Sequence, residues 1–98
     1  MLGSTIGERH IGIDSVLFAE GATEWDFNTI ARTGNSKYVM NVHSILVNTA
    51  GTVRGYLKGE GPDNIDTWTV TAGEKHDLAF SHIEREGTTA RGIKIIGA

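Results

Sequence analysis

The chain has 98 residues, a formal net charge of −3, no cysteine and 39% hydrophobic residues. A chain of this length fits one domain, because its hydrophobic core is too small to divide in two. Its 12 acidic and 9 basic residues are scattered, with no run of Lys or Arg to neutralise phosphates, so neither nucleic acid nor a membrane is an expected partner. The absence of cysteine excludes disulfides and thiolate metal sites.

Residues 1–12 are expected to form an extended N-terminal arm. They contain three glycines and few large apolar side chains, so little in this stretch offsets the entropy of ordering the backbone. Such an arm is expected either to be mobile or to order against a neighbouring subunit. The stretch does not have the pattern of a signal peptide, and no apolar run in the chain approaches the roughly 20 residues of a membrane helix.

Residues 13–98 predict a single domain built from short strands. Trp25, Phe27 and Thr29 alternate with polar Asp26 and Asn28, which is the period of a half-buried strand. No window of eleven residues keeps a helical period, so little or no helix is expected. The pattern predicts strands at 15–19, 24–32, 37–48, 52–58, 65–71, around 78–82 and at 91–97.

The fold class that follows is all-β, either a small antiparallel β-sandwich or a jelly-roll-like barrel. The stretch 37–48 has apolar residues on both parities, which indicates a central strand that is covered on both sides. Glycine, proline, Asp and Asn at 59–64 predict the clearest loop. The sequence does not distinguish a sandwich from a closed barrel.

The four histidines are the candidate metal ligands of the chain. Zinc could use three of them with a carboxylate such as Asp77, but none of the four has a recognised spacing. His76 and His82 share a strand parity, yet lie about 20 Å apart along an extended strand. No metal site and no cofactor is therefore expected, and the roles of His43, His76 and His82 stay open.

No catalytic residues are expected either. Asp14, Ser15 and His10 are too close in sequence to give a triad its separate geometry. The loop at 59–64 lacks the spacing of a phosphate-binding loop. Three acidic residues near it lack the spacing of a calcium loop: Glu60, Asp63 and Asp66. An active site assembled at a subunit interface is the enzymatic alternative.

Trp25 and Phe27 allow two interpretations because they share one face of a predicted strand. They either fill the core or form a platform on which a sugar ring stacks. In the second case, Asp63 and Asn64 could fix the hydroxyl groups of a carbohydrate. A carbohydrate- or ligand-binding β-sandwich module is therefore the alternative function.

Several segments between residues 38 and 96 carry a family resemblance. They are Ile-Leu-Val-Asn-Thr-Ala-Gly-Thr-Val at 45–53, Leu-Lys-Gly at 57–59, Trp-Thr-Val-Thr-Ala-Gly at 68–73 and Glu-Gly-Thr-Thr-Ala-Arg-Gly-Ile at 86–93. In order and content they resemble small structural proteins encoded beside phage capsid genes, including the head-spike base proteins of gene transfer agents. The resemblance brings no catalytic residues.

The resemblance implies a non-enzymatic virion structural protein, assembled in the host cytoplasm. It would be a capsid decoration or spike-base subunit that forms a pentamer or trimer, binds the major capsid protein and holds a spike or fibre protein. Strand edges or the N-terminal arm would pair with neighbouring subunits, since a core this modest gains stability from oligomerisation.

Overall fold

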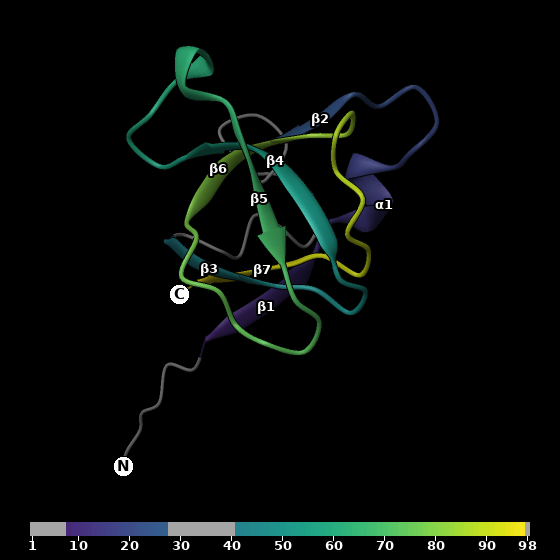
Figure 1. Cartoon of the computed structure of the whole chain (residues 1–98), viewed down its shortest axis with the longest axis vertical. Helices are drawn as coiled ribbons and strands as arrows, with labels where there is room; N and C mark the ends of the chain where they lie inside the picture. Colours follow the sequence, from purple (N-terminus) through teal and green to yellow (C-terminus); the bar gives the residue numbers. More distant parts are fainter. Residues whose placement is uncertain (1–7, 28–40, 98) are drawn as a thin grey trace.

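The computed structural model describes residues 8–27 and 41–97, and these form two antiparallel sheets (Figure 1). The elements, in chain order, are β1 (Arg9–Gly12), α1 (Asp14–Leu17), β2 (Glu24–Asp26), β3 (Val42–Leu46), β4 (Gly51–Leu57), the 3-10 turn η2 (Pro62–Asn64), β5 (Asp66–Val70), β6 (Phe80–Glu84) and β7 (Lys94–Gly97). No helix in this part of the chain is long and apolar enough to cross a membrane.

The three-stranded sheet has the order β1-β7-β3, and the four-stranded sheet has the order β2-β6-β4-β5. Figure 1 shows β1, β3 and β7 together on the lower side of the molecule, with β4, β5 and β6 above them. This arrangement confirms the predicted all-β class and corresponds to the sandwich alternative. The strands expected at 52–58, 65–71 and 91–97 appear as β4, β5 and β7.

The core lies between the two sheets and consists mainly of branched aliphatic side chains. Trp25 of β2 and Phe80 of β6 are its largest members, and both are fully buried. Trp68 of β5 packs edge-on against Phe80, with ring centroids 5.1 Å apart. Burying such side chains stabilises a fold by roughly 1.5–3 kcal/mol each, so this layer holds the sheets together.

The strand predicted at 15–19 is wrong, because residues 14–17 form the short helix α1. Ile13 and Leu17 are one helical turn apart and both fully buried, and the Leu17 N–H donates to the Ile13 carbonyl over 2.8 Å. Asp14 accepts bonds from the N–H groups of Gly92 and Ile93, both at 2.8 Å. These contacts with a segment nearly 80 residues away stabilise the helical turn. The sequence does not reveal the helix, because five residues are too few to show a helical period.

The prediction of a central strand at 37–48 is also wrong in its position. The described part of that stretch is β3, which lies at an edge of its sheet, whereas β7 is central. Val42, Ser44 and Ile45 of β3 are buried and His43 is exposed, while the chain near His76 bridges Ile45 at the outer edge of the strand. Residues 37–40, like residues 28–32 of the strand expected at 24–32, lie outside the described residues.

The boundary expected for the arm differs from the observed one. Residues 9–12 form β1, which pairs with β7 of the same chain in the register Arg9 to Gly97 and Gly12 to Lys94. No local pattern indicates this pairing, because β1 supplies few apolar side chains and is held by backbone bonds to a distant strand. Residues 1–7 of the expected arm lie outside the described residues.

Candidate functional site: an open strand edge and a polar cluster

The outer edge of β5 is the first candidate site. β5 pairs with β4 on one side, and no other described strand pairs with it on the other. Its exposed positions include Thr67 and Thr69, and its five residues contain neither Lys, Arg nor Pro. An edge of this kind offers unpaired backbone groups to another chain.

The backbone of β5 shows which groups are on offer. The Thr67 N–H donates to its neighbour's carboxylate, Asp66 Oδ1, over 2.8 Å and therefore does not serve the ladder with β4. Alternate residues of a strand direct their backbone groups to the same side, so the Thr69 N–H also faces away from β4. Asp66 thus occupies one outward donor, and Thr69 presents the next.

The second candidate is a cluster of ionisable side chains on the outer face of the four-stranded sheet. Across the strands, Asp26 pairs with His82 and His82 with Tyr56. One row along, Glu24 pairs with Glu84 and Glu84 with Arg54. The alternation of β-strands places all six side chains on one face, opposite the core.

His82 is the centre of this cluster and is only 6% exposed. Its Nδ1 lies 3.2 Å from Asp26 Oδ2 and 3.6 Å from Glu24 Oε2, while its Nε2 lies 3.4 Å from Glu84 Oε2. Tyr56 stacks on the imidazole, with the ring centroids 4.7 Å apart and the planes 7° from parallel. The ring is therefore fixed in place while carboxylates surround both of its nitrogens.

The charges of the cluster are unevenly balanced. Arg54 Nη1 forms a salt bridge with Glu84 Oε1. Burial raises the pKa of the Tyr56 phenol, and the negative charges of Asp26 and Glu24 raise it further. The charges of these two carboxylates therefore act on the neighbouring phenol.

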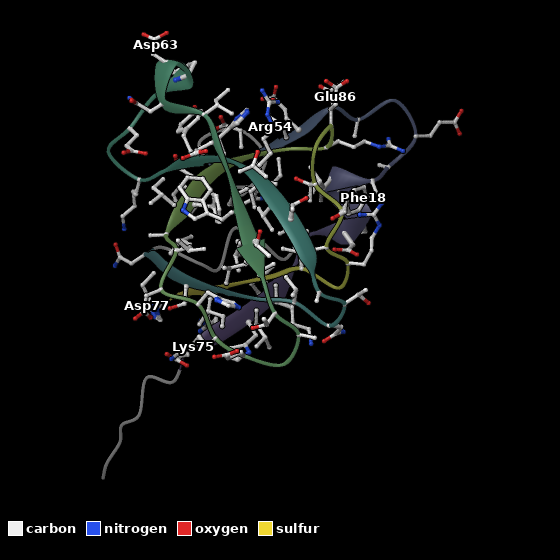
Figure 2. The ribbon with its side chains drawn as sticks, viewed as in Figure 1. Phe18, Arg54, Asp63, Lys75, Asp77 and Glu86 are labelled. Atoms are coloured by element: carbon white, nitrogen blue, oxygen red, sulfur yellow. The ribbon has the colours of Figure 1, made fainter. Side chains whose placement is uncertain are left out.

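A second polar cluster lies on the three-stranded sheet around Glu8. Its carboxylate is 2.8 Å from Lys75 Nζ, 3.7 Å from His10 Nε2 and 3.6 Å from His43 Nε2. The hydrogen bond from Lys75 is the main cause that lowers the pKa of Glu8. Here an ammonium already occupies the place of a cation, and all four side chains are well exposed. In Figure 2, Lys75 and Asp77 lie at the lower end of the molecule, far from Arg54.

An open pocket of about 930 Å³ lies between α1 and the turn after β6. Its two arginines are engaged in the fold. Arg91 lies over the Phe18 ring, 3.9 Å from its centroid, and donates to the carbonyls of Thr88 and Ala90. Arg85 donates to carbonyls at 19 and 22. These guanidinium groups hold loops together, which explains their presence without a ligand.

The residues singled out from the sequence fall mostly outside any common site. Trp25 is fully buried, so it belongs to the core and cannot be a sugar-stacking platform, while Phe27 packs against the core beside it. Asp14 serves the turn before β7 rather than a triad. Figure 2 shows Asp63 at the tip of η2, with its side chain pointing outward. Among the described residues, the only His and carboxylate group with metal-binding proximity is Glu24, Asp26 and His82.

His82 was a candidate metal ligand in the sequence, but the carboxylates that surround it were not predicted. The signal was the spacing Glu-x-Asp at 24–26 and His-x-Glu at 82–84, which puts each pair on one face of a strand. Only the antiparallel pairing of β2 with β6 brings the two pairs together, and 56 residues separate Asp26 from His82. His76 instead uses its Nε2 to accept from the Thr71 N–H at 3.1 Å.

Comparisons with protein-family models, with curated proteins and with solved structures found no match. The resemblance to phage head-surface proteins therefore rests on the sequence segments alone.

Proposed function

We propose that this protein is a non-enzymatic structural subunit that assembles with copies of itself through the open edge of β5. The observation that carries the proposal is the outward backbone of β5, where Thr69 has a free side in the described structure. Strand addition at such an edge forms backbone hydrogen bonds that any chain in extended conformation can complete. It also places the exposed threonines beside the neighbouring subunit.

The symmetry of assembly depends on what β5 meets. Two copies of β5 facing one another give a two-fold dimer, because the same surface is used on both sides. A trimer or pentamer requires β5 to meet a different segment of the next subunit, so that the contacts close into a ring. Each edge contact is small, and the ring gains its stability from repeating it.

The setting of this assembly is proposed from the sequence resemblance. In that setting the ring decorates the capsid surface of a virion, contacts the major capsid protein and holds a spike or fibre. Binding of the purified chain to phage heads, scored by co-sedimentation, tests this part separately from self-assembly.

The experiment on self-assembly measures the native mass by light scattering over a concentration series. The native chain is expected to form a closed ring of three or five copies. Thr69→Lys places a charge on the free edge and should raise the dissociation constant at least tenfold. Asn64→Lys adds the same charge in the exposed turn η2 and should leave the mass unchanged.

A native chain that stays monomeric at high concentration would contradict self-assembly in solution. An oligomer that both lysine variants leave intact would show that the interface lies elsewhere. Circular dichroism of each variant confirms that the change in mass does not come from unfolding.

A further inference from the structure

We propose that Glu24, Asp26 and His82 bind a divalent transition-metal ion of the zinc class on the outer face of the four-stranded sheet. Each residue offers one ligand atom, and the three atoms lie within 4.8 Å of one another. His82 Nδ1 faces both Asp26 Oδ2 and Glu24 Oε2. One imidazole with two carboxylates is a donor set that suits zinc and its neighbours in the transition series. Such an ion would link β2 to β6.

The spacing of the donor atoms supports this assignment. Zinc bonds of about 2.0–2.1 Å in a tetrahedron put neighbouring donors about 3.3–3.4 Å apart. His82 Nδ1 stands 3.2 Å from the Asp26 oxygen and 3.6 Å from the Glu24 oxygen. Both separations match the edge of that tetrahedron within a few tenths of an ångström. A water molecule would complete the fourth position.

The local charge also favours a cation. Glu24 has no basic partner other than His82 among the described residues, and the nearby Arg54 is bound to Glu84. A divalent ion would sit where the three donors meet and would offset the charge of their carboxylates.

The site combines a fixed ligand with an open entrance. His82 is held by the stack with Tyr56 and by its burial, so its Nδ1 direction is set before an ion arrives. Glu24 has a side chain that is 47% exposed and borders solvent, which gives an ion a route into the cluster. Preorganised ligands of this kind lower the entropy cost of binding. The Glu8 cluster differs because Lys75 already supplies its cation.

The test is isothermal titration calorimetry of the full chain with zinc chloride, and with magnesium chloride as the selectivity control. One zinc per chain is expected, with little or no heat from magnesium. Glu24→Gln and Asp26→Asn each remove a ligand charge with almost no change in shape, and each should weaken zinc binding at least tenfold. Because Glu24 is half exposed, its variant is expected to fold, and circular dichroism checks this.

The matched control changes the other histidine cluster. His43→Gln removes a histidine near Glu8 and should leave zinc affinity unchanged. Absence of binding at millimolar zinc would overturn the proposal. The proposal would also be overturned if Glu24→Gln and Asp26→Asn bound zinc as tightly as the native chain, or if His43→Gln lost zinc binding.

Discussion

The edges of the two sheets differ in how they are protected. β2 has three residues, two of them acidic, and β1 begins with Arg9 beside the ion pair of Glu8 and Lys75. β3 is covered where the Ile45 N–H and carbonyl both bond to the backbone of His76, at 2.9 Å each. Among the described residues, only Asp66 protects the edge of β5 in this way. Short strands, charges and covering segments all block edge pairing, so the difference supports the proposal that assembly uses β5.

The largest expected effect comes from removing a protected edge. Deleting residues 1–12 removes β1 and uncovers one side of β7, whose Ile95 and Ile96 are fully buried. The loss of about four backbone hydrogen bonds should lower the free energy of unfolding by about 2–4 kcal/mol. Urea denaturation measures this loss, and the uncovered β7 should also cause aggregation.

The pairing of β1 with β7 gives residues 9–12 a role in folding, in addition to the contact with a neighbouring subunit that was expected for the arm. Unchanged stability of the truncated chain would show that β1 adds little to the sheet.

A smaller effect is expected in the segment around His76, which pairs with the outer edge of β3. His76→Ala removes the acceptor of the Thr71 N–H and loosens the segment that bridges Ile45. One hydrogen bond is lost, so the free energy of unfolding should fall by about 0.5–1.5 kcal/mol. Hydrogen exchange at the Ile45 amide should become faster. His10→Ala, which changes an exposed histidine, is the control, and equal losses in both variants would contradict the role of His76.

Asp66 occupies an outward N–H of β5, and its removal should strengthen assembly rather than weaken the fold. Asp66→Ala releases the Thr67 N–H and removes a negative charge from the edge. One more backbone donor becomes available to a neighbouring subunit, so the dissociation constant of the assembly should fall about threefold to tenfold. Asp63→Ala removes the same charge in η2 and serves as the control. Weaker assembly of Asp66→Ala would argue against pairing through β5.

The smallest effect concerns the ion pair at the start of β1. The hydrogen bond from Lys75 lowers the pKa of Glu8 below its ordinary 4.5. A lowered folded-state pKa stabilises the fold above the unfolded-state pKa, and this contribution is lost as the pH falls through the folded-state value.

Lys75→Met should therefore raise the pKa of Glu8 toward its ordinary value. The loss of folding stability at acid pH that comes from Glu8 should then become smaller. A carbon-detected NMR titration of Glu8 follows the change, with Lys94→Met as the control of equal charge. An unshifted Glu8 titration in Lys75→Met would contradict the ion pair.

The sequence predicted the parts of the fold that depend on local patterns. The alternation in β4 and β5, and the loop at 59–64, are visible because their apolar and turn residues lie close together in the chain. It could not predict α1, where Asp14 is held by Gly92 and Ile93, nor the pairing of β1 with β7. These depend on contacts between distant segments. The partners of His82 were hidden for the same reason.

The most direct test of the proposed assembly is amide hydrogen exchange at Thr69, measured by NMR in dilute and in concentrated protein. If β5 pairs with a neighbouring subunit, the Thr69 amide should exchange rapidly when dilute and become protected as the native mass rises. An amide that exchanges equally fast in an established oligomer would contradict assembly through this edge.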